Sequence, residues 1–150
     1  GNTVRYNAPT SLQELAKVLN ENHAAKIIAA GTDLSLEITQ SLQEFSHIVN
    51  VTSVKELQAI SDSHSELEIG SAVTYSDASA SLFNYWPDLE SFLHRFGSLP
   101  IRNWATIGGN IANASPIGDM PPVLIALEAE LKLSKNSNVR LVKLEDFFVS

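Results

Sequence analysis

The stretch from Leu99 to Pro122 has the sequence LPIRNWATIGGNIANASPIGDMPP and is the most informative part of the chain. It contains the glycine pair Gly108–Gly109, and small polar residues follow it closely at Asn110, Asn113, Ser115 and Asp119. Paired glycines let a backbone approach a ligand closely and accept positive φ. Small polar groups interleaved with apolar ones suit a largely buried, polyhydroxylated ligand. The stretch therefore predicts a ligand-binding loop, and the alternative is a tight bend between core segments.

A second glycine-bearing turn lies near the N-terminus of the chain. Lys26–Ala30 is a short apolar run ending at Gly31, which is typical of a buried strand that enters a turn. Thr32 or Asp33 would cap a helical turn after it, and free backbone N–H groups there suit an anion. Taken alone, a turn of this kind is usually only a turn. The glycines form neither G-x-G-x-x-G nor a Walker A loop, so Rossmann and P-loop folds are disfavoured.

The first part of the chain has the pattern of a small parallel α/β unit. Overlapping capping boxes in Thr10–Glu14 and apolar residues at helical spacing predict a helix from about Ser11 to Asn20. Lys26–Ala30 and His47–Val51 are the predicted strands. Residues 1–55 are therefore expected to form a small lobe.

The rest of the chain has a different pattern, with antiparallel hairpins and short helices. One hairpin is expected where Leu57–Ile60 and Leu67–Ile69 flank the polar turn SDSHSE, and another around KNSN between Glu130–Ser134 and Asn138–Lys143. Helices are predicted at Thr74–Asn84, Pro87–Phe96 and Pro121–Leu127. The fold class is therefore α+β, with residues 56–150 as a larger lobe that carries an antiparallel sheet.

Composition restricts the classes of partner and chemistry. The chain has 150 residues and a net charge of -7, which argues against nucleic acid or an anionic membrane as the main partner. It has no cysteine, which excludes disulfides, thiolate catalysis and cysteine-ligated metals from these residues. These features predict a cytoplasmic location. Gly1 without a methionine and the apolar end LEDFFVS suggest an excised, C-terminally truncated piece.

The remaining chemistry-bearing residues give weaker signals. The histidines His23, His47, His64 and His94 have no metal-like spacing and are mostly expected at the surface or as caps. Arg102 is equally compatible with a phosphate and with a carboxylate partner. The sequence has no G-x-S-x-G elbow, and no catalytic side chain is assigned.

Three segments together resemble the FAD domains of the molybdenum hydroxylases, the family of xanthine dehydrogenase and carbon monoxide dehydrogenase flavoproteins. IRNWATIGGNIANASPIGDMPPVL is similar to the family's long flavin loop, KIIAAGTDLSLEI to its first flavin loop, and EIGSAVTYSD to the strand and turn between them. The resemblance covers nearly the whole chain. It implies an FAD-binding domain of the vanillyl-alcohol-oxidase (PCMH) type over residues 1–150, with the larger lobe incomplete.

The resemblance also implies a set of cofactor-binding residues. Ile27 through Leu34 would wrap the diphosphate through backbone N–H groups, and Thr106 would donate its hydroxyl to a phosphate oxygen. Asp119 would accept hydrogen bonds from a sugar hydroxyl. The full implied set is Ile27, Ile28, Ala29, Ala30, Gly31, Thr32, Asp33, Leu34, Ile69, Gly70, Thr106, Gly108, Gly109, Asn110, Ala112, Ser115 and Asp119.

The family's chemistry implies an oxidoreductase in which this chain supplies only the flavin step. A molybdopterin cofactor and 2Fe-2S clusters would lie on partner domains or chains, and electrons would pass through FAD to NAD or oxygen. The family continues beyond the final DFF with strands that hold the flavin, so this chain alone is expected to be inactive. The alternative is a degenerate relative that binds a nucleotide or a partner chain without redox turnover.

Overall fold

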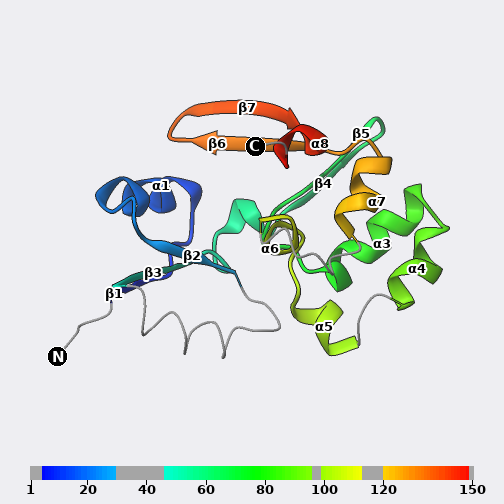
Figure 1. The fold of residues 1–150 in the computed structure, drawn as a ribbon, viewed down its shortest axis with the longest axis horizontal. Helices are drawn as coiled ribbons and strands as arrows, with labels where there is room; N and C mark the ends of the chain where they lie inside the picture. Colours follow the sequence, from blue (N-terminus) through cyan, green and yellow to red (C-terminus); the bar gives the residue numbers. More distant parts are fainter. Residues whose placement is uncertain (1–4, 30–45, 96–98, 113–119, 149–150) are drawn as a thin grey trace. The chain divides into compact units, whose positions relative to one another are not determined.

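The computed structural model describes residues 5–29, 46–95, 99–112 and 120–148 of the chain (Figure 1). The chain divides into two compact units, Gly1–Gly109 and Asn110–Ser150. In the described part, no helix is long and apolar enough to cross a membrane. The predicted lobe boundary after residue 55 stays a prediction.

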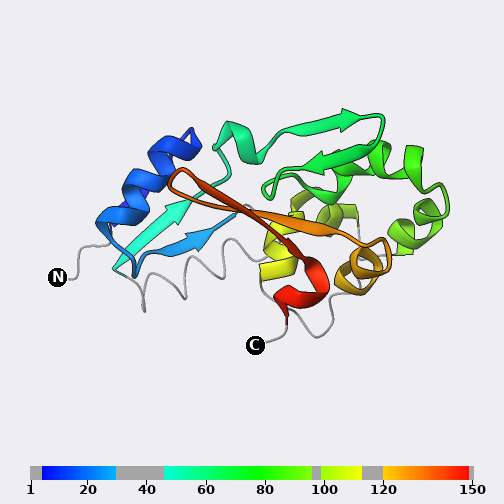
Figure 2. The same ribbon diagram turned by 90° about the horizontal axis from the view of Figure 1, so that it is seen from above.

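The N-terminal part of the first unit is a parallel three-stranded sheet (Figure 2). Its strands are β1 (Arg5–Asn7), β2 (Lys26–Ile28) and β3 (His47–Asn50), in the order β1-β3-β2. Both strand pairs are parallel, as expected for the small lobe. The sequence did not predict β1, because three residues are too few for an alternating pattern to emerge.

Helix α1 (Leu12–Glu21) packs against one face of this sheet. Its buried Val18 joins Val49, Val51 and Val54 in a hydrophobic cluster, which Leu12, Leu15 and Leu19 extend. The leucines recur at helical spacing, so a single face of α1 meets the core. The predicted helix is therefore confirmed to within one residue at either end.

Two side chains cap the start of α1, one from Ser11 before the helix and one from Glu14 in its first turn. The Ser11 hydroxyl accepts a hydrogen bond from the Glu14 N–H at 3.1 Å. The Glu14 carboxylate accepts from the Thr10 N–H at 2.8 Å and from the Thr10 hydroxyl at 3.1 Å. Both hydrogen bonds lower the pKa of Glu14, and the bond from the Thr10 backbone N–H has the larger effect. The capping box is thus present, but its return bond goes to Thr10 instead of Ser11.

Replacing Ser11 by alanine removes the acceptor for the Glu14 N–H at the first turn of α1. We expect Ser11→Ala to lower the free energy of unfolding by about 1 kcal/mol, the usual cost of a lost N-cap. Urea unfolding followed by circular dichroism measures this change. Ser11→Asn, which retains a capping acceptor, should stay near the parent value; an equal loss in both variants would contradict the capping role.

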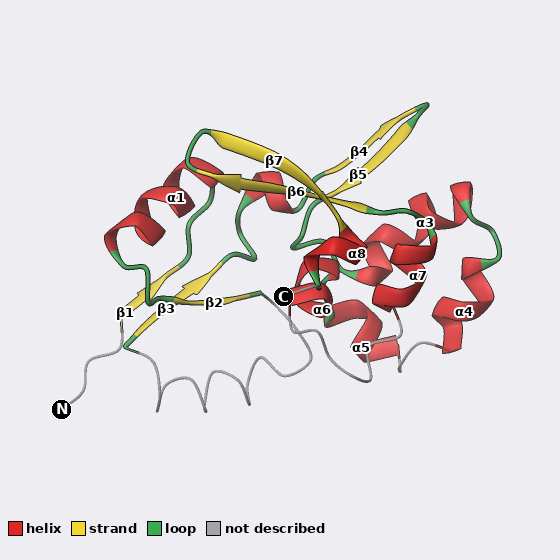
Figure 3. Cartoon of the chain, turned by 45° about the horizontal axis from the view of Figure 1, so that its top comes forward, coloured by secondary structure: helices red, strands yellow, loops and turns green. Residues whose placement is uncertain are grey.

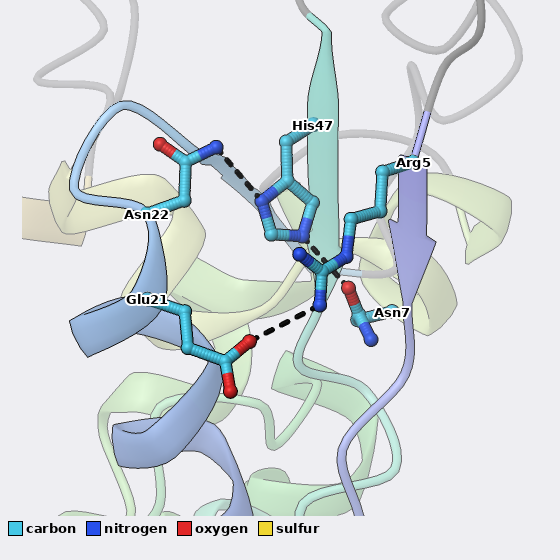
Figure 4. A network of polar contacts seen from close by, with 5 residues as sticks. All are labelled: Arg5, Asn7, Glu21, Asn22 and His47. Carbon is cyan, nitrogen blue, oxygen red and sulfur yellow. Dashed lines mark hydrogen bonds and ion pairs between the residues drawn. The ribbon is translucent and has the colours of Figure 1, made fainter.

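His47 is buried inside the small lobe, whereas the sequence predicted mostly surface or capping positions for the histidines. The side chain of His47 is 2% exposed, on the first residue of β3. Its Nε2 lies 2.7 Å from Asn7 Oδ1 on β1, and its Nδ1 lies 3.1 Å from Asn22 Nδ2 at the C-cap of α1 (Figure 4). His23, His64 and His94 are exposed, as expected. Sequence spacing does not reveal His47, because its partners are 40 and 25 residues away.

The remainder of the first unit begins with a short 3-10 turn, η1 (Lys55–Leu57), which leads into the predicted hairpin (Figure 3). The strands are β4 (Ile60–Ser63) and β5 (Glu66–Ile69). Ser61–Ser63, expected in the turn, pair with Glu66–Glu68 in the ladder, so the turn is shorter than predicted. Helices α3 (Tyr75–Tyr85) and α4 (Leu89–Arg95) confirm the two helices expected next.

Two further helices were not predicted. They are α5 (Leu99–Trp104) and α6 (Ile107–Ala112). Gly108 and Gly109 therefore lie in a helical turn and not in a loop, and neither has a φ in the left-handed region. The prediction of a loop at the glycine pair is wrong, and the glycines do not use their capacity for positive φ. Glycine disfavours helix interiors, so propensity argued against α6 and tertiary contacts decide its conformation.

The second unit contains a helix, a hairpin and a final helical turn. Its elements are α7 (Met120–Ala126), β6 (Glu130–Lys135), β7 (Asn138–Lys143) and α8 (Leu144–Phe147). The helix and the hairpin were both predicted. Asn136 sits in the hairpin turn with a φ of 55°, a left-handed conformation that asparagine tolerates. Met120 and Leu144 are fully buried.

Candidate functional site

The backbone at the start of α3 pairs with the backbone at the start of α6. Thr74 and Thr106 form an antiparallel bridge, in which the Tyr75 N–H donates to the Ala105 carbonyl at 3.1 Å. The Ile107 N–H donates in return to the Val73 carbonyl at 3.0 Å. Each threonine also caps its own helix with its hydroxyl. The bridge therefore fixes the two helix starts side by side.

Gly108 is a glycine because Ser71 approaches it closely. The Gly108 N–H donates to the Ser71 carbonyl at 2.9 Å. A Cβ added at Gly108 would lie 2.4 Å from Ser71 Cβ and 2.7 Å from the Ser71 carbonyl oxygen. Both distances are shorter than real Cβ contacts allow. The contact joins the segment after β5 to α6, so two of the three family-like segments meet here.

Gly70 meets an even tighter constraint, from the backbone of η1. Its N–H donates to the Ala59 carbonyl at 2.9 Å, and a Cβ there would lie 2.2 Å from the Leu57 carbonyl oxygen. That same oxygen accepts from the Ala72 N–H at 2.9 Å. The Leu57 side chain packs on the α1 core. Leu57 thereby connects the parallel lobe to the segment that holds α6.

Gly109 differs from the other two glycines in what surrounds it. A Cβ added there would meet a single group, the Thr106 hydroxyl oxygen, at 2.8 Å. Thr106 is a buried residue, and its hydroxyl accepts from the Gly109 N–H at 3.1 Å. Accepting this bond leaves the hydroxyl hydrogen for donation to another oxygen. The first turn of α6 thus offers a hydroxyl donor next to an otherwise open glycine.

The backbone N–H groups at this turn are already used by the protein. Those of Ile107, Gly108 and Gly109 donate to Val73, Ser71 and the Thr106 hydroxyl, respectively. These three N–H groups are therefore not available to a ligand in this conformation. Asn110 and Ala112 continue α6 and are half-buried and exposed, respectively.

The first predicted loop is described only at its start. Ile27 is 48% exposed on β2, which corrects the expectation of a buried position, whereas Ile28 is buried and its carbonyl accepts from the Val51 N–H at 2.9 Å. Ala29 packs on the α1 core. Ile69 pairs with Ile60 at the end of the hairpin. The remaining predicted residues lie outside the described ones: Ala30, Gly31, Thr32, Asp33, Leu34, Ser115 and Asp119.

Arg102 holds the end of a neighbouring helix. Its Nη1 donates to the carbonyl oxygens of Leu93 at 3.2 Å and His94 at 3.0 Å, close to the C-terminus of α4. A cation there also interacts favourably with the helix dipole. The sequence suggested a phosphate or a carboxylate as the partner of Arg102, and these backbone carbonyl oxygens are neither. Among the described residues, no cluster of His, Cys, Asp or Glu is placed to hold a metal ion.

A hollow of about 140 Å³ lies between α3, α4 and α5. Its lining includes Tyr75, Phe83 and Leu93, and burial raises the pKa of Tyr75. Pockets for ligands of drug size measure roughly 300–1,000 Å³. The hollow is too small for a dinucleotide, so the surface around Gly109 and Ser71 is the better candidate site.

Comparison with known proteins gives a consistent family. Residues 2–150 match the family model described as the FAD binding domain in molybdopterin dehydrogenase. The chain is 34% identical over 142 residues to xanthine dehydrogenase of Drosophila subobscura, covering 87% of the chain and 11% of that protein. It is 34% identical over 140 residues to the glyceraldehyde dehydrogenase medium chain of Sulfolobus acidocaldarius, covering 92% of the chain and 50% of that protein.

A solved structure gives the same result for the fold. The crystal structure of quinoline 2-oxidoreductase from Pseudomonas putida 86 superposes with a TM-score of 0.86 at 32% identity. The match covers 98% of this chain and 52% of that chain. The chain therefore spans about half the length of the medium chain and of the solved chain that it matches. The α+β fold expected from the sequence is confirmed.

The sequence pointed to Gly70 and Gly108 but not to Ser71, which follows Gly70 and contacts Gly108. Ser71 contacts Gly108 through both its carbonyl and its Cβ, and it was not among the predicted site residues. The available signal was its position, a hydroxyl residue directly after a glycine at the end of a predicted strand. Thr74 was missed as well, although it precedes a predicted helix as a capping residue.

Proposed function

The chain belongs to the family of FAD-binding domains in molybdopterin dehydrogenases, and on this premise we propose that it is the electron-transfer flavin domain of a molybdenum hydroxylase. When bound, FAD supplies the redox chemistry that links iron–sulfur centres on a partner to NAD or oxygen. A xanthine dehydrogenase-like enzyme that reduces NAD, located in the cytoplasm, is the specific form of the proposal. No catalytic side chain is assigned to these residues.

The residues at the start of α6 fit an oxygen-rich ligand. The single observation that carries the proposal is the junction of two family-like segments, made by the Gly108 N–H and the Ser71 carbonyl at 2.9 Å. Next to it, the Thr106 hydroxyl keeps its hydrogen for a phosphate oxygen, and Gly109 leaves room for close approach. Hydroxyl donors suit the phosphate and sugar oxygens of FAD.

The remaining proposed contacts follow the family pattern of the sequence. The segment from Ile27 to Leu34 would hold the diphosphate, while Ile69 and Gly70 would lie near the adenosine half. Gly108, Gly109 and Asn110 would lie along the diphosphate and ribityl region, and Leu34 and Ala112 near the flavin ring. Ser115 and Asp119 would complete the site with polar contacts. The protein's own work is to bind and orient the cofactor.

The electron-transfer role is tested in the native protein that carries this chain. The reduced iron–sulfur partner is mixed with the FAD-loaded protein, and the flavin absorbance is followed by stopped flow with NAD or oxygen present. Bleaching of the flavin band followed by its return with NADH formation is expected. A flavin that binds but is never reduced by the partner would instead favour a degenerate, non-redox relative.

Thr106 offers a specific test of the cofactor site. Thr106→Val preserves the shape of the side chain but removes the hydroxyl that meets Gly109. We expect FAD affinity to fall about tenfold, since a hydrogen bond to a charged phosphate contributes about 1.5 kcal/mol or more. Isothermal titration with FAD measures the change. Thr106→Ser keeps the hydroxyl and is the matched control; an unchanged Kd in Thr106→Val would exclude the proposed phosphate bond.

A further inference from the structure

The face of Gly108 that a side chain would occupy is already filled by Ser71. A Cβ at Gly108 would lie 2.4 Å from Ser71 Cβ and 3.0 Å from Ser71 Cα. A ligand that approaches this face of Gly108 therefore meets Ser71 first. Gly108 is therefore a glycine because Ser71 packs against it. On this face, Ser71 and not Gly108 is the residue that a ligand would contact.

The side chain of Ser71 is suited to that role. Ser71 is exposed, whereas the neighbouring Ala72 and Val73 are buried. Its carbonyl accepts from the Gly108 N–H, whereas its hydroxyl is a separate polar group on the side chain. Within the described part of the chain, no hydrogen bond of this hydroxyl to protein is found. The backbone of Ser71 thus fixes α6 while its hydroxyl remains open to a ligand.

The backbone at Ser71 is fixed from two sides. Gly70, directly before Ser71, is bound to Ala59 and pressed against the Leu57 backbone. The Ala72 N–H, directly after it, donates to the Leu57 carbonyl at 2.9 Å. A residue held on both sides by backbone bonds loses little conformational freedom on binding a ligand. The Cβ that carries the hydroxyl is therefore held beside the first turn of α6.

We propose that Ser71 is a further cofactor-binding residue, whose hydroxyl bonds to a phosphate or sugar oxygen of FAD beside Gly108. This inference rests on the proposed function, because it names a new contact within the same site. A serine hydroxyl both donates and accepts, so either kind of oxygen is a suitable partner. Ser71 also holds α6 through its carbonyl, and that role survives the loss of the hydroxyl.

The test compares Ser71→Ala with the parent in the native protein. Alanine keeps the Cβ and the carbonyl, so the melting temperature without ligand should stay unchanged. The Kd for FAD should rise about five- to tenfold, the loss expected for one hydrogen bond. Ser61→Ala, another exposed serine on the β4–β5 hairpin, is the matched control and should bind FAD as the parent does.

Titrations with ADP and with riboflavin separate the possible partners of the hydroxyl. A weaker ADP affinity alone places the bond on the diphosphate or adenosine sugar, and a weaker riboflavin affinity alone places it on the ribityl chain; both outcomes support the contact. An FAD affinity within twofold of the parent in Ser71→Ala overturns the inference. A parent protein that binds no FAD at all overturns the proposed function instead, so the two failures are distinguishable.

Discussion

Gly70→Ala is expected to lower the free energy of unfolding by about 3 kcal/mol, at the upper end of what overpacking costs. The new Cβ would lie 2.2 Å from the Leu57 carbonyl oxygen and 2.4 Å from its carbonyl carbon. These are backbone atoms, so a side-chain rotation does not relieve the clash. Relief requires η1 to move away, which also breaks the bond between the Ala72 N–H and the Leu57 carbonyl. Urea unfolding followed by circular dichroism measures the loss.

The three glycines of the site provide an internal series for this prediction. Gly108→Ala meets the Ser71 Cβ and carbonyl, so its loss should fall below that of Gly70→Ala. Gly109→Ala meets a single hydroxyl oxygen at 2.8 Å and, since alanine also favours the helix, should be the least destabilised. A Gly109→Ala variant as unstable as Gly70→Ala would contradict the assignment of Gly70 and Gly108 as packing glycines.

His47→Leu is expected to lower the free energy of unfolding by about 3 kcal/mol, because it strips two amides of their shared partner. The side-chain oxygen Oδ1 of Asn22 accepts from the Ala24 N–H at 3.0 Å, so the side-chain amide nitrogen Nδ2 donates to His47 Nδ1. The Nε2–H of the ring then donates to Asn7 Oδ1 at 2.7 Å (Figure 4). Leucine fills the space but satisfies neither group, which leaves an unpaired donor and an unpaired acceptor near the core.

The neighbouring ion pair is the matched control for this variant. Arg5 Nη2 lies 3.1 Å from Glu21 Oε2, and the two side chains are 56% and 47% exposed. Exposed pairs of this kind contribute about 0–1 kcal/mol, so Glu21→Gln should change the unfolding midpoint little. Urea titrations of both variants give the comparison. Equal losses in His47→Leu and Glu21→Gln would mean that the histidine bonds are not important for stability.

Local patterns were enough to predict most elements of the fold. The capping residues before Leu12 located α1, and alternating residues around Asn136 located the second hairpin. The parallel pairing of β2 with β3 followed from the helix-and-strand order of the first fifty residues. These features depend on residues that are close in the sequence, so the sequence alone was enough to predict them.

Features that depend on distant contacts were not predicted. Helix α6 forms around two glycines because Ser71 and Val73 accept its first N–H groups, and those residues lie more than thirty positions earlier. The burial of His47 likewise depends on amides from β1 and α1. The sequence therefore identified the glycine pair as a point of close approach but predicted a loop there, where the structure has a packed helical turn.

The most direct test of the account is whether the native protein that carries this chain retains FAD. Purified protein is incubated with FAD, desalted and examined by absorbance and by thermal unfolding. We expect a yellow protein with a flavin band at about 450 nm and a raised melting temperature. A colourless protein whose melting temperature is unchanged by FAD would contradict it.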